Sequence, residues 1–179
     1  ETTQLIVTLQ KGAFRLSDIQ KYTNCRTTYI TLELQKEMEK VEYGELSQTS
    51  SKGLSMEKAS SIVCGGRGIG GPEGFELLSK LANLLDNGVI GASRAACDAG
   101  WIDHSYQIGL TGRNVSPNLY FAIGISGASQ HMVGCIKSKT IVAINKDPSA
   151  LIFNDADIGI IGEWQKIIPL LIKKIQSAK

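Results

Sequence analysis

The chain has 179 residues, of which 42% are hydrophobic and 20% charged, and its formal net charge is +2. This composition is typical of one folded domain, with or without a short appendage, and it excludes disordered and fibrous chains. The near balance of charges argues against nucleic acid and anionic membranes as partners. No apolar run reaches the length of a membrane-spanning helix, so we expect that this is not a membrane protein.

The first part of the chain, residues 1–59, is expected to be mostly extended and to end in a linker. Residues 47–53 (SQTSSKG) are polar and turn-rich, which is typical of a linker. The chain begins with Glu1 and not with Met, so we expect a processed or excised chain. Apolar and β-branched residues predict three strands before the linker, at 5–9, 27–34 and 41–46.

From residue 60 onward, strands and helices alternate. Apolar residues recur on one face of 73–85 and of the segment that starts at 164, which predicts two amphipathic helices. Pro169 predicts a kink or a fresh helix start within the second one. Nearly continuous apolar strands that alternate with helices indicate an α/β fold, a parallel sheet with helices on both faces. We predict strands at 61–64, 89–92, 119–123, 140–144 and 158–161, and short helices at 95–99 and from 127.

A glycine-rich segment, residues 64–73 (CGGRGIGGPE), joins the first of these strands to the first helix. Its glycines fit the pattern GxGxxG, in which the backbone approaches a pyrophosphate at a helix N-terminus. About twenty residues later, where an NAD site has an acidic ribose-binding residue, the sequence has Ser93 and Arg94. NADP or a flavin dinucleotide is therefore favoured over NAD, and a tight turn without a ligand stays an alternative.

Further polar or glycine-containing segments follow the later strands. Each of them alone is as typical of a turn or a capped helix as of a ligand site. Because the carboxyl ends of parallel strands meet at one edge of a sheet, the five segments together indicate an elongated dinucleotide site. They contain no evident carboxylate pair or nucleophile–base pair, so we expect no catalysis by side chains. The four later segments are 91–101 (GASRAACDAGW), 107–113 (QIGLTGR), 124–131 (GISGASQH) and 145–148 (NKDP), the last followed by Asp157.

The cysteines and histidines are too few and too scattered for a metal site. Cys25, Cys64, Cys97 and Cys135 form no CxxC pair, so we expect small buried thiols in a reducing compartment. The chain has only two histidines, which leaves little for a metal site or a catalytic triad based on histidine.

Taken together, four segments closely resemble the C-terminal, FAD-binding domain of the electron transfer flavoprotein alpha subunit. The order SRAA, then GISGxxQH, then INKDP is highly specific. The resemblance runs from about residue 60 to the end, and it implies a fold like the cofactor domains of deoxyhypusine synthase and the sirtuins. It also implies that 60–179 is the FAD-binding domain and 1–59 a remnant of an N-terminal domain with its linker. The four segments are CGGRGIGGPEGFELL, GASRAACDAGW, QIGLTGRNVSPNLYFAIGISGASQH and SKTIVAINKDPSALIFNDADIGIIG.

The resemblance implies a role for each matching residue. Arg94 would lie near the reactive edge of the flavin ring, Thr111 would bond to the flavin N5, and Gln130 and His131 would meet the pyrimidine end. A guanidinium, an imidazole and a helix N-terminus there would stabilise the negative charge of a reduced flavin. The implied cofactor-binding residues are Arg67, Ser93, Arg94, Gln107, Ile108, Gly109, Leu110, Thr111, Ser126, Gly127, Ala128, Ser129, Gln130, His131, Asn145 and Asp157.

The phosphates and the adenosine side have their own implied residues. Arg67, Ser93 and Ser126 would serve the phosphates and the ribityl chain, and Asn145 and Asp157 would hold the adenosine. Leu110 stands where a common form of the family has glutamine. The leucine side chain cannot replace a glutamine contact, so only the backbone of Leu110 is expected to contact the flavin.

By the resemblance, the chain is part of an electron carrier with FAD and not an enzyme with its own substrate. It would take electrons from flavin dehydrogenases, such as acyl-CoA dehydrogenases, and pass them to a quinone oxidoreductase. It would pair with the electron transfer flavoprotein beta subunit. It would work in the cytoplasm of a bacterium or in the mitochondrial matrix of a eukaryote, and would not be secreted. The alternative from the residues is an NADP-binding oxidoreductase domain.

Overall fold

The computed structural model describes residues 28–29 and 56–178. The chain divides into two compact units, Glu1–Lys52 and Gly53–Lys179. The three strands and the linker expected before residue 56 lie outside the described residues, apart from 28–29. The interpretation of 1–59 as a domain remnant therefore stays a prediction, and the fold described below is that of the second unit.

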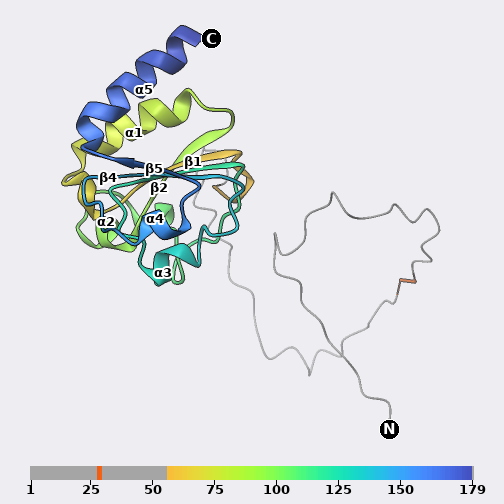
Figure 1. Cartoon of the computed structure of the whole chain (residues 1–179). Helices are drawn as coiled ribbons and strands as arrows, with labels where there is room; N and C mark the ends of the chain where they lie inside the picture. Colours follow the sequence, from red (N-terminus) through yellow and green to blue (C-terminus); the bar gives the residue numbers. More distant parts are fainter. Residues whose placement is uncertain (1–27, 30–55, 179) are drawn as a thin grey trace. The chain divides into compact units, whose positions relative to one another are not determined.

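Five parallel strands form one sheet in the order β2–β1–β3–β4–β5 (Figure 1). Every neighbouring pair is parallel, and Val63 at the middle of β1 faces Ile90 on one side and Phe121 on the other. Each strand was predicted to within one residue at either end, because apolar runs bounded by polar or glycine residues mark buried strands. The strands are β1 Ser61–Gly65, β2 Gly88–Ala92, β3 Leu119–Ile123, β4 Ile141–Asn145 and β5 Ile158–Ile161.

The helices that connect the strands vary widely in length. α1 and α5 are amphipathic, as predicted, but α5 runs through Pro169 as one helix, so the fresh start expected there is wrong. The four residues of α4 carry no helical period, and the sequence did not reveal this helix. The α-helices are α1 Glu73–Asn83, α2 Arg94–Asp98, α3 Ser129–Met132, α4 Ile152–Asp155 and α5 Trp164–Ala178, and the 3₁₀ turns are η3 Met56–Lys58, η4 Arg67–Ile69 and η5 His104–Tyr106.

Side chains that alternate along the strands build a separate core on each face of the sheet. On one face α1 and α5 pack together, and Leu78, Leu81 and Ile168 are fully buried there with Val63 (Figure 1). Each such side chain contributes roughly 1.5–3 kcal/mol through its burial. The predicted α/β architecture with helices on both faces is confirmed, since α3 and α4 cover the opposite face.

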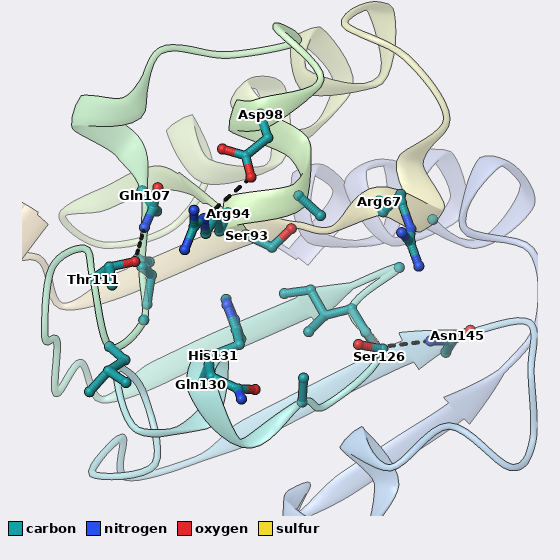
Figure 2. Close-up of a pocket in the computed structure, with 18 of the residues that line it drawn as sticks. Arg67, Ser93, Arg94, Asp98, Gln107, Thr111, Ser126, Gln130, His131 and Asn145 are labelled. Carbon is teal, nitrogen blue, oxygen red and sulfur yellow. Dashed lines mark hydrogen bonds and ion pairs between the residues drawn. The ribbon is translucent and has the colours of Figure 1, made fainter.

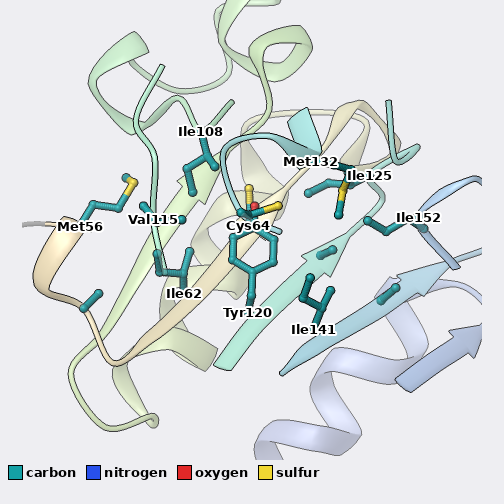
Figure 3. Close-up of a cluster of buried hydrophobic side chains, with 14 residues drawn as sticks. Met56, Ile62, Cys64, Ile108, Val115, Tyr120, Ile125, Met132, Ile141 and Ile152 are labelled. Atoms are coloured by element: carbon teal, nitrogen blue, oxygen red, sulfur yellow. The ribbon is translucent and has the colours of Figure 1, made fainter. Parts of the chain in front are cut away.

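The core on the second face surrounds a buried tyrosine. Tyr120 on β3 is fully buried among Ile62, Cys64, Ile141 and Ile152 (Figure 3). Burial raises the pKa of the Tyr120 hydroxyl well above its ordinary value, so it stays protonated and must find hydrogen-bond partners inside the protein. One of these partners, described below, belongs to the candidate site.

The edge strand β5 departs from the pattern of buried strands. Ile158 is 53% exposed and Ile161 is 64% exposed, although both belong to an apolar strand. Among the described residues β5 pairs only with β4, so it lies at the edge of this sheet.

The ends of β1 and β3 approach each other closely through glycine residues. The Gly66 amide donates to the Ile123 carbonyl at 2.8 Å, and the Gly68 amide donates to the Gly124 carbonyl at 2.9 Å. A Cβ atom at Gly66 would lie 2.2 Å from the Gly124 carbonyl oxygen, so no side chain fits between the two strand ends. The sequence suggested that these glycines make room for a pyrophosphate, but Gly66 makes room for the backbone of the loop after β3.

Replacing Gly66 with alanine tests this close approach. We expect Gly66→Ala to lower the free energy of unfolding by roughly 1–3 kcal/mol, because the added methyl group must push two backbone segments apart. Gly71→Ala is the matched control in the same loop, since its Cβ would meet only the carboxylate end of the flexible Glu73 side chain. Urea unfolding of both variants decides the matter, and equal losses of stability would contradict the packing role of Gly66.

Candidate functional site

A pocket of about 840 Å³ opens at the carboxyl edge of the sheet (Figure 2). Its walls come from the segments that follow β1, β2, β3 and β4. β2 lies on one side of β1, whereas β3, β4 and β5 lie on the other. In open α/β sheets a crevice forms where the strand order reverses in this way, and ligands bind in it. The volume lies within the range of about 300–1,000 Å³ that is usual for ligand pockets.

Most of the residues expected to bind FAD line this pocket. Gly127 and Ser129 do not line it, but they alternate with lining residues, Gly127 in the loop before α3 and Ser129 as the first residue of that helix. Asp157 is the one expected residue that the structure places elsewhere. The lining residues that the sequence proposed are Arg67, Ser93, Arg94, Gln107, Ile108, Gly109, Leu110, Thr111, Ser126, Ala128, Gln130, His131 and Asn145.

Asp157 lies at the opposite edge of the sheet, so the structure does not support its expected contact with adenosine. Its carboxylate accepts a hydrogen bond from the amide of Ile141, the first residue of β4, at 2.7 Å. At the carboxyl end of β5, on the pocket side of the sheet, the acidic residue is Glu163. Glu163 lines a smaller hollow of about 110 Å³ that shares Asn145 and Lys146 with the main pocket. The rule that ligand residues follow strand ends would have identified Glu163 in the sequence.

The segment 107–113 forms one wall of the pocket and is held by backbone hydrogen bonds at both ends. The Ile108 amide donates to the carbonyl of Ala92 at the end of β2, at 2.9 Å. The Leu110 amide donates to the Gln130 carbonyl at 2.7 Å. The sequence left the Leu110 backbone as a possible ligand contact, but its amide is already used within the protein.

The short helix α2 brings Ser93 and Arg94 to the pocket. The Ser93 hydroxyl caps this helix by accepting from the Ala96 amide at 3.4 Å. The Arg94 guanidinium lies 3.3 Å from the Asp98 carboxylate, and the Arg94 side chain is 66% exposed. Asp98 therefore offsets part of the positive charge that Arg94 brings to the pocket.

The charges around the pocket favour an anionic ligand. Arg67, Arg94 and Lys146 bring three positive charges to its walls, against the two carboxylates of Asp98 and Asp147. Within the described residues, the Arg67 guanidinium makes no hydrogen bond or ion pair, so it is available to a ligand. Seven further lining residues belong to the segments that the sequence singled out, but they were not among the expected cofactor-binding residues. They are Gly68, Ala95, Asp98, Gly124, Ile125, Lys146 and Asp147.

His131 lines the pocket and has a buried ring nitrogen without a hydrogen-bond partner among the described residues. Its Nε2 lies 2.9 Å from the Tyr120 hydroxyl, in the core of the sheet. Its Nδ1 is buried and forms no hydrogen bond with any of the described residues. Burial lowers the pKa of His131 to about 4, although the Ile108 carbonyl acts in the opposite direction. The imidazole is therefore neutral near pH 7, and a polar ligand atom would remove the cost of the unpaired Nδ1.

The GxGxxG segment contributes less to the pocket than its pattern predicts. The pocket is lined by Arg67 and Gly68 from this segment but by no residue of α1. The first turn of α1 carries Glu73 and Glu76, whose carboxylates already complement its positive end. The helix N-terminus therefore gives the NADP alternative no support, although Arg67 and Arg94, on which it also depends, line the pocket. Gly66 itself serves the packing of β1 against β3.

Among the described residues, no cluster of three or more His, Cys, Asp or Glu side chains could hold a metal ion. In the same part of the chain, no helix is long and apolar enough to cross a bilayer. Cys64, Cys97 and Cys135 are buried free thiols, as expected. Burial raises the pKa of Cys135 to about 12, which keeps this thiol protonated. Cys25 lies outside the described residues.

Comparison with known proteins gives one family and a set of similar chains. Residues 55–136 match the family model described as "Electron transfer flavoprotein FAD-binding domain". The chain is 56% identical over 126 residues to an electron transfer flavoprotein subunit alpha of Thermoanaerobacterium thermosaccharolyticum. The aligned region covers 70% of this chain and 38% of the relative.

Two further relatives extend the comparison. Protein FixB of Clostridium saccharobutylicum is 39% identical over 177 residues, which is 97% of this chain and 52% of the relative. A protein of Saccharomyces cerevisiae named as a probable mitochondrial electron transfer flavoprotein subunit alpha is 51% identical over 132 residues, which is 73% of this chain and 38% of the relative. The matches thus span about half of these relatives or less.

The burial of His131 predicts a dependence of stability on pH. The pKa of His131 is about 4 in the folded chain, against an ordinary value of 6.5. Between these values the unfolded chain binds more protons, so the free energy of unfolding falls as the pH drops from 6.5 toward 4, by about 3 kcal/mol in total. His131→Asn removes this contribution, so its stability should approach that of the wild type as the pH falls. Urea unfolding across this pH range tests it, and parallel profiles of the two proteins would contradict the buried neutral imidazole.

Proposed function

Because residues 55–136 match the model of electron transfer flavoprotein FAD-binding domains, we propose that the second unit of this chain is such a domain and forms the FAD-bearing part of an electron carrier. The observation that carries the proposal is the convergence of four strand-end segments on one elongated, positively charged pocket. We propose that electrons arrive from flavin dehydrogenases, such as acyl-CoA dehydrogenases, and leave to a quinone oxidoreductase. In this proposal the carrier is a heterodimer with a beta subunit.

The arrangement of the pocket supports a direction for the bound cofactor. Thr111 lies toward one end of the pocket, Arg67 and Asn145 lie at the other, and Arg94 and His131 lie between them (Figure 2). The flavin ring would lie near Thr111, Arg94 and His131, and the phosphates and adenosine would extend toward Arg67 and Asn145. The unpaired Nδ1 of His131 and the free guanidinium of Arg67 fit such a polar, anionic ligand.

The side chains of the pocket would hold the cofactor and adjust its charge. FAD supplies the electron-transfer chemistry when it is bound. Arg94 would favour negative charge on the ring, and Asp98 at 3.3 Å would moderate this effect. The neutral His131 would contribute a hydrogen bond and no net charge. We propose a carrier without substrate turnover of its own, because these roles need no proton transfer by a side chain.

The same proposal includes the cellular compartment of the protein. The name of the Saccharomyces cerevisiae relative contains the word mitochondrial, whereas the name of the Thermoanaerobacterium thermosaccharolyticum relative does not. We propose the mitochondrial matrix for this chain if its source is eukaryotic and the cytoplasm if it is bacterial.

Ligand-dependent melting distinguishes FAD from NADP. We expect FAD to raise the melting temperature, because a ligand that binds only the folded chain adds about 2.7 kcal/mol of stability at one hundred times its dissociation constant. NADPH should have no effect, since no residue of α1 lines the pocket. Differential scanning fluorimetry with each ligand is the measurement. A shift with NADPH and none with FAD would overturn the proposal.

Substitutions at Arg94 test its effect on the bound flavin. A charge-assisted contact of about 1–3 kcal/mol corresponds to roughly 50–130 mV for a one-electron step. We expect Arg94→Ala to lower the midpoint potential of the flavin by an amount near the lower value, because Arg94 is largely exposed and paired with Asp98. Arg94→Lys should lower it less, since the charge is kept but the planar guanidinium is lost.

Asp98→Asn should shift the same potential in the opposite direction, because it removes the carboxylate that offsets Arg94. Anaerobic redox titration of the variants gives all three values. An unchanged potential in Arg94→Ala, together with loss of FAD binding, would make Arg94 an anchor for the cofactor that does not tune its potential.

A further inference from the structure

A row of four polar side chains runs behind and along one wall of the pocket. This polar row consists of Asp98, His104, Gln107 and Thr111. The His104 Nε2 lies 3.8 Å from Asp98 Oδ1, and the His104 Nδ1 lies 3.1 Å from Gln107 Oε1. Gln107 Nε2 lies 2.9 Å from Thr111 Oγ1. Asp98, Gln107 and Thr111 line the pocket, whereas His104 stands behind them on η5 and does not.

The hydrogen bonds of the polar row have a fixed direction. The Gln107 side-chain nitrogen donates to the Thr111 hydroxyl oxygen, so the Gln107 carbonyl oxygen is the atom that faces His104. A carbonyl oxygen can only accept, and therefore the His104 Nδ1 must carry a hydrogen. The Thr111 oxygen accepts from Gln107 and makes no other hydrogen bond within residues 56–178. Its own hydrogen is thus free to be donated to a ligand in the pocket.

The orientation of Gln107 is well constrained, because this residue is buried. Only 6% of it is exposed, and its backbone amide donates to the His104 carbonyl at 3.0 Å. Its backbone carbonyl accepts from the Arg113 amide at 2.8 Å. The side-chain amide is therefore confined, and its orientation toward Thr111 decides which tautomer of His104 fits beside it.

The other end of the polar row reaches Arg94. Asp98 presents one carboxylate oxygen to Arg94 Nε at 3.3 Å and the other to the His104 ring. Asp98 thus hydrogen-bonds the guanidinium of Arg94 and lies beside the imidazole of His104. The contact with His104 is an ion pair only when the ring carries both of its protons.

We propose that His104 is a positioning residue for the cofactor pocket, which acts through Gln107 to present the Thr111 hydroxyl as a hydrogen-bond donor to the flavin. This inference rests on the proposed function for the identity of the ligand. It adds a residue outside the pocket to those that determine cofactor binding. His104 itself touches no ligand.

The experiment is a double-mutant cycle on the binding of FAD to the full chain. His104→Phe keeps a ring but removes both nitrogens, and Thr111→Val removes the hydroxyl at nearly constant shape. Each single variant should weaken FAD binding about three- to tenfold, the range for one hydrogen bond. The double variant should bind no more weakly than Thr111→Val alone, because His104 acts through Thr111. Fluorescence titration of FAD gives the dissociation constants.

Two further variants separate positioning from a general structural effect. His104→Asn should restore most of the affinity, since its side-chain nitrogen can replace the Nδ1 donor to Gln107. Tyr106→Phe is the matched control on the same turn, because the Tyr106 hydroxyl makes no hydrogen bond with the described residues and does not line the pocket. Its affinity for FAD should equal that of the wild type.

A measurement without FAD tests the polar row directly. The ¹⁵N NMR shifts of the imidazole in the ligand-free chain should show the hydrogen of His104 on Nδ1, with the signal assigned by comparison with His104→Phe. A hydrogen on Nε2 alone would overturn the proposal. Additive losses in the double-mutant cycle, or no loss in His104→Phe, would also overturn it. Failure of the wild type to bind FAD would instead overturn the proposed function, together with the role of His104 in it.

Discussion

The close approach of β1 and β3 at their carboxyl ends is the constraint on which the site depends. Two backbone hydrogen bonds of 2.8 and 2.9 Å join the loops that follow these strands, and only glycine fits at Gly66. This contact fixes where the order of the sheet reverses, and the pocket opens beside it. The segments after β2 and β4 then complete the walls on either side.

The pocket has a buried side against the core of the sheet and a charged side that faces solvent. His131 reaches from the pocket into the core, where it contacts Tyr120 and stays neutral because it is buried. Arg67 and Arg94 are exposed to solvent. A ligand in this pocket meets buried hydrogen-bonding groups on the core side and exposed cations on the solvent side. This combination suits a large ligand with a planar polar ring and a phosphate portion.

The wall formed by 107–113 depends on contacts between segments that are distant in the chain. It is tied to the end of β2 through Ala92 and to α3 through Gln130. The polar row adds side-chain contacts from α2 and η5 to the same wall. The position of the Thr111 hydroxyl is therefore a joint property of several elements, and η5 would influence a bound cofactor without touching it.

The sequence alone determined where the strands lie along the chain to within one residue, because buried parallel strands are short apolar runs with polar or glycine residues at their ends. The order of the strands in the sheet came from the structure. It also located the pocket-lining segments, since residues that follow parallel strands share one edge of the sheet. It erred for Asp157, which precedes β5 and so lies at the opposite edge, and it overlooked Glu163, which follows that strand.

Only the tertiary structure decided what the individual side chains do. The sequence could not show that Gly66 meets the backbone after β3, since such a contact depends on the distance between two strand ends. It could not predict that His131 bonds to Tyr120 or that the His131 Nδ1 lacks a partner among the described residues. Burial and hydrogen-bond partners come from segments that meet only in the folded chain. The segments that follow the strands specify which residues gather at the carboxyl edge of the sheet. The packing of the folded chain then sets the charge of these residues, their partners and the direction of their hydrogen bonds.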